Sequence, residues 1–195
     1  MRTRQGRPVR SKGMALAALS YVLGLLLAAP VLARDPDPFP ARGGLDVARA
    51  AASSWAPDAE LIYVENDEAV AADGTSERWG YLFHSKTLGQ VRAYSIRGGK
   101  IVVAETLDMK FEAPPLSTDW IDSGAAIEAG DRIAASEFKK TGGASLTTML
   151  LMRGAFQDKD PDQTTWTLIY TSPRAPSLFV VVDASAAKVR RTWRG

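Results

Sequence analysis

The stretch Trp79-Gly-Tyr-Leu-Phe-His-Ser85 recurs 87 positions later as Trp166-Thr-Leu-Ile-Tyr-Thr-Ser172. Each copy begins with Trp, ends with Ser and carries large apolar side chains at alternate positions. This period of two is typical of a strand with one buried face. The matched residues at both ends favour an internal repeat over a chance likeness, and a repeat determines the architecture of the whole chain.

The same order of elements surrounds both copies. Leu61–Val64 falls on Thr148–Leu151 at the offset of 87, and Lys100–Val102 falls on Lys188–Arg190 at 88. The first copy is predicted to hold a helix from Asp46, as its cap, to Trp55, and strands at 61–64, 79–85, 91–97 and 100–106. The second is predicted to hold a helix from Asp122 or Ser123 to Gly142-Gly143, and strands at 146–152, 165–172, 178–183 and 188–193. The predicted buried stripes are Val47, Ala51 and Trp55 in the first helix, and Ile127, Gly130, Ala134 and Phe138 in the second.

These elements predict an α+β fold built from two helix-plus-antiparallel-sheet units in tandem. The Pro-containing segment LDMKFEAPPLSTDW is predicted to link them. The expected organisation is a signal peptide at 1–33, an extended lead-in at 34–44, a first unit at 45–106, the linker at 107–120 and a second unit at 121–195. Each unit is expected to keep one sheet face open, where a partner could bind by shape or by strand addition at an edge.

The first 33 residues have the order of a secretory signal. A basic stretch precedes the apolar run Met14–Ala29, and small residues follow at Val31 and Ala33, so cleavage is expected before Arg34. The alternative is an uncleaved anchor from Met14 to Ala33, which has about the length that spans a bilayer. Ser20, Gly24 and Pro30 favour the cleaved form, and a periplasmic or extracellular protein is predicted.

The charge balance argues against nucleic-acid binding. The formal net charge is +2, but five of the 24 basic residues and none of the 22 acidic ones precede residue 34. The remainder therefore carries 19 basic and 22 acidic side chains and lacks a basic footprint. With no Cys and a single His, disulfides, thiolate metal sites and His-built metal sites or relays are excluded or disfavoured.

The second half resembles PepSY and PepSY-like domains. The resemblance rests on Ile121-Asp-Ser-Gly-Ala-Ala-Ile127, the Trp-led strand, Phe179-Val-Val-Val-Asp-Ala184 and Lys188-Val-Arg190. The family's terminal hairpin contains a Gly that Asp183-Ala-Ser-Ala-Ala-Lys188 lacks, and the first half matches less well. The resemblance implies a secreted, non-enzymatic binding module that restrains an envelope or extracellular peptidase. The tandem of small units also resembles beta-lactamase inhibitory proteins in outline, although those carry disulfides.

Two residues, His84 and Asp122, are candidates for catalysis. His84 has no G-x-S-x-G serine in the chain to activate, and it aligns with Thr171, a plain sheet position. Asp122-Ser123-Gly124 looks like an aspartic-protease loop, but such an enzyme needs two aspartates and the first half has no second copy. Capping of a helix by Asp122 is therefore favoured over hydrolysis. No P-loop or dinucleotide motif is present, so no nucleotide cofactor is predicted.

Two acidic loops leave a ligand-binding alternative open. One contains Glu65, Asp67, Glu68, Asp73 and Glu77, and the other contains Asp158, Asp160 and Asp162. Alternate carboxylates could hold calcium, but neither loop matches the twelve-residue calcium motif, and solvated hairpin tips are favoured. A small-ligand or calcium-binding periplasmic protein thus remains the alternative. No catalytic, cofactor or metal residue is assigned, no membrane partner is expected after cleavage, and a protein partner is predicted.

Overall fold

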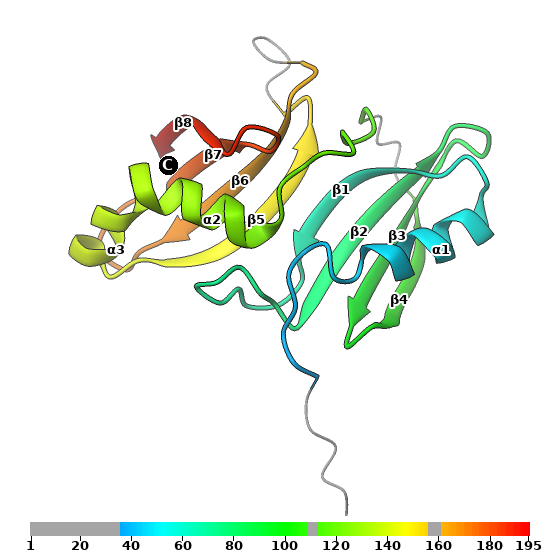
Figure 1. The fold of residues 1–195 in the computed structure, drawn as a ribbon, viewed down its shortest axis with the longest axis horizontal. Coiled ribbons are helices and arrows are strands. Elements are labelled where there is room, and N and C mark those ends of the chain that lie inside the picture. The colour runs from blue at the N-terminus through cyan, green and yellow to red at the C-terminus, as the bar shows by residue number, and fades with distance from the viewer. Residues whose placement is uncertain (1–35, 109–112, 156–160) are drawn as a thin grey trace, which may run out of the picture. The chain divides into compact units, whose positions relative to one another are not determined.

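A computed structural model describes residues 36–108, 113–155 and 161–195 of the protein. The eight strands in these ranges form one antiparallel sheet in the order β4-β3-β2-β1-β5-β6-β7-β8 (Figure 1). The strands are β1 Glu60–Asn66, β2 Arg78–Ser85, β3 Gln90–Arg97, β4 Lys100–Leu107, β5 Ser145–Arg153, β6 Thr164–Thr171, β7 Leu178–Asp183 and β8 Lys188–Arg194.

The predicted pair of tandem helix-plus-sheet units is wrong, because β1 and β5 pair with each other. Val64 lies opposite Leu151, and both are fully buried. The hydrogen-bonding edges that two separate sheets would expose at β1 and β5 are satisfied by this pairing. Residues 35–195 accordingly form one compact unit with a common hydrophobic core. Strand periodicity specifies which face of a strand is buried but not which strand lies beside it, so the sequence could not reveal the junction.

The strand register also corrects one alignment of the repeat. Trp79 and Trp166 occupy equivalent positions, since Trp79 pairs with Ile96 and Trp166 with Val182 on the same side of the sheet. In β1 and β5, however, equivalent residues are 85 apart. Leu61 lies opposite Phe83 and Leu146 opposite Tyr170, and an irregularity in the register follows each of them. The predicted match of Leu61 with Thr148 is therefore displaced by two residues.

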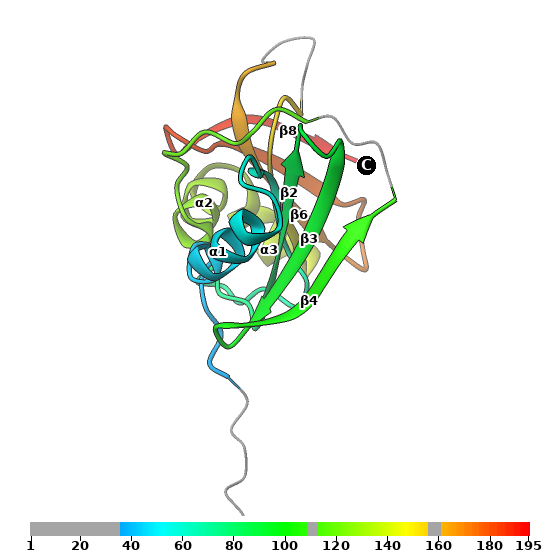
Figure 2. The ribbon, with the colours of Figure 1, turned by 90° about the vertical axis from the view of Figure 1, so that its right-hand side faces the viewer.

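Both helical segments cover the same face of the sheet. The first is α1, Leu45–Trp55, and the second runs through α2 Ser123–Gly130, the π-helical turn η1 Asp131–Ala135 and α3 Ser136–Gly142. Figure 1 shows α1 in front of β2 and β3, and α2 and α3 in front of the strands of the other half. In Figure 2 the helices again lie to one side of β2, β3 and β4. The opposite face of the sheet carries no described helix.

The helices differ from the predictions in local detail. Asp46 lies in the first turn of α1 and does not cap it, because the N-cap position is Gly44, which has no side chain. The buried residues of α1 are Leu45, Ala48 and Ala52, whereas the predicted stripe of Val47, Ala51 and Trp55 is only partly buried.

The second helix is altered by its π turn. A π turn adds a residue to the helical repeat, so Ala135 is buried in place of the predicted Ala134. Gly143, with φ of 59°, ends the helix in the left-handed region as predicted.

Three tryptophans form the centre of the core. Trp166 makes edge contacts with Trp79 at 6.2 Å and with Trp120 at 5.9 Å between ring centroids. The indole N–H of Trp79 donates to the Phe39 carbonyl, and that of Trp166 donates to the Ile121 carbonyl, both at 2.8 Å. Each Trp-led strand is thus bonded to the segment that leads into the helix of its own half. Trp120, the last residue of the predicted linker, is also buried.

The predicted linker packs against the sheet where it is described. The Leu116 N–H donates to the Leu61 carbonyl at 2.8 Å, and the Ser117 N–H donates to the Thr164 hydroxyl at 3.1 Å. The predicted signal peptide lies outside the described residues. Within the described ranges, no helix has the length and apolar character needed to cross a membrane.

Candidate functional site

A row of four residues crosses the helix-free face of the first half. The alternation of β2 buries Trp79, Tyr81 and Phe83 under α1 and turns Gly80 to the opposite face. The strand register places Glu65, Gly80, Ser95 and Val103 in line on β1 to β4. Gly80 and Ser95 are small, so a hollow of about 230 Å³ opens along this row. We call this hollow the trough and define it by these four residues together with Asp67 and Arg78.

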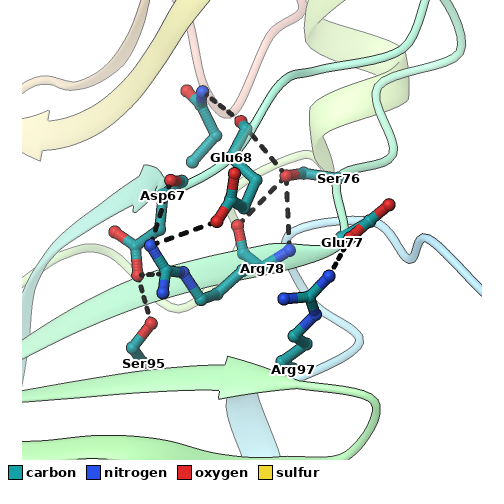
Figure 3. A network of polar contacts seen from close by, with 8 residues as sticks. Asp67, Glu68, Ser76, Glu77, Arg78, Ser95 and Arg97 are labelled. Carbon is teal, nitrogen blue, oxygen red and sulfur yellow. Dashed lines mark hydrogen bonds and ion pairs between the residues drawn. The ribbon is translucent and has the colours of Figure 1, made fainter. Parts of the chain in front are cut away.

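Asp67 lies between Ser95 and Arg78, as Figure 3 shows. Its carboxylate accepts a short hydrogen bond from the Ser95 hydroxyl and lies 3.6 Å from the Arg78 Nε. The Arg78 guanidinium also lies 3.4 Å from Glu68. A Cβ built on Gly80 would come within 2.7 Å of the Asp67 Oδ1. The absence of a side chain at Gly80 therefore gives Asp67 its place above β2.

The loop after β1 is fastened by further polar contacts (Figure 3). The buried Ser76 hydroxyl lies 3.1 Å from the Arg78 carbonyl and 3.3 Å from the Glu68 carbonyl. Arg97 forms a close ion pair with Glu77. Because these bonds tie the loop to β2 and β3, the carboxylates of the trough are held in fixed positions.

The trough has an excess of negative charge. Its lining contains two carboxylates, Glu65 and Asp67, and one guanidinium, that of Arg78, which also lies 3.4 Å from Glu68. Glu65 accepts a hydrogen bond from the Tyr63 hydroxyl at 2.8 Å. Burial, and secondarily the Glu65 charge, raise the pKa of Tyr63 well above its usual range, so its hydroxyl stays a donor. The volume is below that of pockets for drug-sized ligands but suits one long side chain. A cationic group is the chemistry that such a lining favours.

Among the described residues, neither His84 nor Asp122 belongs to a catalytic arrangement of side chains. His84 lies on the helix-free face of β2, but no hydrogen bond or ion pair joins it to a described serine or carboxylate. Ser95 donates to Asp67 without an imidazole between them. Asp122 accepts the Ser123 N–H at 2.8 Å and the Arg42 N–H at 3.1 Å, which confirms that it caps α2.

The acidic residues of the two predicted acidic loops make contacts with different partners. Glu65 and Asp67 line the trough, Glu68 and Glu77 pair with arginines, and Asp73 accepts the N–H and hydroxyl of Thr75 within its own turn. Asp162 pairs with Arg153 at 3.1 Å, whereas Asp158 and Asp160 lie outside the described residues. Across the described ranges, no group of three or more His, Cys, Asp or Glu could hold a metal ion.

The outermost strand of the first half borders the trough. Every residue of β4 from Lys100 to Thr106 is exposed, including Ile101 at 41%, Val102 at 50% and Val103 at 40%. These apolar side chains lie on both faces of a strand whose outer edge has no partner strand in the described sheet. At the other end of the sheet, β8 is basic, and its Trp193, 39% exposed, stacks on Phe179 at 4.8 Å.

Sequence reasoning missed Gly80, Arg78, Ser95 and Val103 as site residues. None belongs to a motif, and only the register of β3 on β2 and of β4 on β3 brings Ser95 and Val103 into line with Gly80. The one available signal was Gly80, because a glycine in the interior of a strand marks a close approach of other groups.

The comparisons with known proteins support the fold alone. No family model and no curated protein matches the chain, so membership of the PepSY family stays a prediction. Among solved structures, a putative lipoprotein from Clostridium difficile 630 is similar, with a TM-score of 0.51 and 13% sequence identity. The similarity covers 78% of this chain and 93% of that one.

Proposed function

We propose that this chain is a non-enzymatic binding protein of the cell envelope. It takes an extended segment of a partner polypeptide onto the outer edge of β4 and seats a basic side chain of that segment in the trough. The observation that carries the proposal is the exposed, apolar edge strand β4 beside a negatively charged hollow.

The edge itself supports strand addition. Natural sheets usually protect long edges with Lys, Pro, bulges or a covering loop. β4 begins with Lys100 and has one extra residue, Val102, in its pairing with β3, but its run Ile-Val-Val-Ala between Lys100 and Glu105 remains exposed. An added strand would satisfy the outward N–H and C=O groups and cover these side chains.

The trough supports a basic residue in the bound segment. An added strand would lie about 5 Å from β4 and about 10 Å from β3, where Ser95 and Asp67 meet. A side chain that points to the helix-free face beside Val103 would extend across β4 toward these carboxylates. Lys and Arg have the required length and charge.

The resemblance to PepSY domains suggests which partner supplies the segment. The implied partner is an envelope or extracellular peptidase, restrained by occlusion. The leader-like sequence at 1–33 supports an envelope location, and the likeness to a putative lipoprotein is consistent with it. This partner is tested by measuring the rate at which the peptidase hydrolyses its substrate, with and without the protein. The rate should fall when the wild type is added and should not fall when Val102→Lys is added.

Peptide titration tests binding directly. The probes are labelled octapeptides of alternating Thr and Val with one central Lys, the same peptide with Glu, and an alternately N-methylated Lys peptide. We expect fluorescence anisotropy to show the Lys peptide binding about tenfold or more tighter than the Glu peptide. N-methylation should abolish binding, because it removes the edge hydrogen bonds.

Matched protein variants localise the binding. Val102→Lys places a charge on the edge of β4 and should weaken binding about tenfold. Ile133→Lys makes the same kind of change at a residue that is 64% exposed on η1, and should leave binding unchanged. Equal affinity for the Lys and Glu peptides, indifferent to N-methylation, would refute the proposal.

A further inference from the structure

A second hollow, of about 270 Å³, lies where the end of α3, the β6–β7 connection and the end of β8 meet. We propose that this hollow binds a phosphate group through Arg174 and Arg194. The inference is independent of the proposed peptide site, which lies in the other half of the sheet.

Both guanidinium groups are available for a ligand. Within the described residues, neither Arg174 nor Arg194 has a side-chain hydrogen bond or ion pair. Neighbouring cations are neutralised instead, since Lys139 pairs with Asp131 at 2.5 Å and Arg190 pairs with Asp183. The hollow thus combines two arginines with a lining that contains no acidic residue.

Arg194 is positioned by an aromatic ring. Its guanidinium carbon lies 3.7 Å from the centroid of the Phe138 ring. Stacking of this kind uses the face of the guanidinium and leaves its N–H donors in the plane for hydrogen bonds. The Gly195 N–H donates to the Ser177 carbonyl at 3.1 Å, which ties the end of β8 to the connection that carries Arg174.

The connection that carries Arg174 is also held in place. The Ser172 hydroxyl donates to the Gly142 carbonyl at 2.6 Å and accepts the Arg174 N–H at 3.1 Å. Pro173 and Pro176 further restrict the backbone on either side of Arg174. The bond from Ser172 also engages a carbonyl at the end of α3 that would otherwise repel an anion.

Phosphate is the ligand class that fits two arginines. Each planar guanidinium can donate two parallel hydrogen bonds to an oxyanion, and two of them match the double negative charge of a phosphate monoester or inorganic phosphate. The phosphate could belong to a soluble compound or to the head group of an anionic lipid, and the two sources share this chemistry.

Calorimetric titration with inorganic phosphate tests the site. The chain from residue 35 is used, because it forms one compact unit, and chloride at equal ionic strength is the reference. We expect saturable phosphate binding by the wild type and a loss of about tenfold or more in affinity for Arg174→Gln/Arg194→Gln. Arg194→Lys should recover only part of it, because a lysine lacks the fork of donors. Arg49→Gln removes the same charge from an exposed position on α1 and should bind as the wild type does.

Vesicle sedimentation identifies the source of the phosphate. Phosphatidylglycerol vesicles that retain the wild type but not the double variant would assign a lipid head group, with phosphatidylcholine vesicles as the reference. Phosphate binding without vesicle binding would assign a soluble ligand. The proposal is overturned if phosphate and chloride act alike in the titration, or if the double variant binds phosphate as tightly as Arg49→Gln.

Discussion

The two halves of the sheet carry equivalent rows of residues on the helix-free face, with opposite results. In the first half the row is Glu65, Gly80, Ser95 and Val103, and in the second it is Leu150, Thr167, Val181 and Arg191. Thr167 and Val181 place larger side chains at the positions where Gly80 and Ser95 leave a hollow. The same backbone arrangement therefore carries a charged trough in one half and the bulkier, uncharged Thr167 and Val181 at the equivalent positions of the other. The difference depends on two small residues, Gly80 and Ser95, which leave room for the Asp67 carboxylate.

The largest expected effect concerns the core that both halves share. Trp166 contacts two other indoles, whereas Trp79 contacts only Trp166 among the ring pairs of the described core. Trp166→Ala should lower the free energy of unfolding by about 3–5 kcal/mol, and Trp79→Ala should lower it less. Urea unfolding followed by circular dichroism measures both losses of unfolding free energy. Equal losses for Trp166→Ala and Trp79→Ala would contradict the expected order.

A smaller effect is expected from filling the trough. Gly80→Ala forces the Asp67 carboxylate away from Ser95 and Arg78, and should cost about 1–3 kcal/mol of unfolding free energy and reduce binding of the Lys peptide. Thr167→Ala changes the equivalent residue of the other half and should cost about 1 kcal/mol without affecting the peptide. Urea unfolding and anisotropy on both variants separate the halves. Undiminished peptide binding by Gly80→Ala would place the site elsewhere.

Removing the partner of Asp67 should have a still smaller effect on stability. Ser95→Ala deletes the hydroxyl that donates to Asp67 and should lower the free energy of unfolding by about 1 kcal/mol. The carboxylate is then free to pair with the basic side chain of the peptide, so the preference for Lys over Glu should be kept or increased. Anisotropy with both peptides measures this preference, and its loss would mean that Ser95 itself binds the peptide.

The pH dependence should also differ between the halves. A hydrogen bond from the Ser85 hydroxyl, followed by one from the Thr87 N–H, lowers the pKa of Asp58 to about 2. The equivalent Ser172 donates to a backbone carbonyl, which does not titrate. Because the folded pKa is depressed, the stabilisation is complete above the unfolded value near 4 and is lost as the pH falls toward 2.

Urea midpoints measured from pH 5 to pH 2 test this. The wild type should lose more stability over that window than Asp58→Asn does. Parallel curves for the two proteins would show that this contact does not contribute to the acid response.

The sequence predicted local structure better than assembly. Gly98-Gly99, with φ of 54° and 71°, turns β3 into β4 as expected, and the alternation around Trp79 identified the buried face of β2. The pairing of β1 with β5 could not be predicted, because neighbouring strands are selected by tertiary packing. The π turn was also missed, since the helical spacing of Ile127 and Phe138 looks regular.

The site was predicted only in part. Glu65 and Asp67 were noted as acidic loop residues, but nothing in the sequence indicated that Ser95 and Val103 would lie in line with them. That alignment is a property of the strand register. Asp122, by contrast, was identified as a cap from its position before an apolar helix, because capping is a local interaction.

Recognition of a basic side chain by the trough is tested by exchanging its two small residues for their equivalents in the other half. The Lys octapeptide is titrated against the wild type and Gly80→Thr/Ser95→Val, with circular dichroism confirming the fold, and Ser95→Val alone is measured if the double variant does not fold. We predict that the double variant loses its preference for the Lys peptide over the Glu peptide, and that Ser95→Val shows a reduced preference because its larger side chain narrows the trough. An unchanged preference in the folded variants would contradict the claim that the trough recognises the basic side chain.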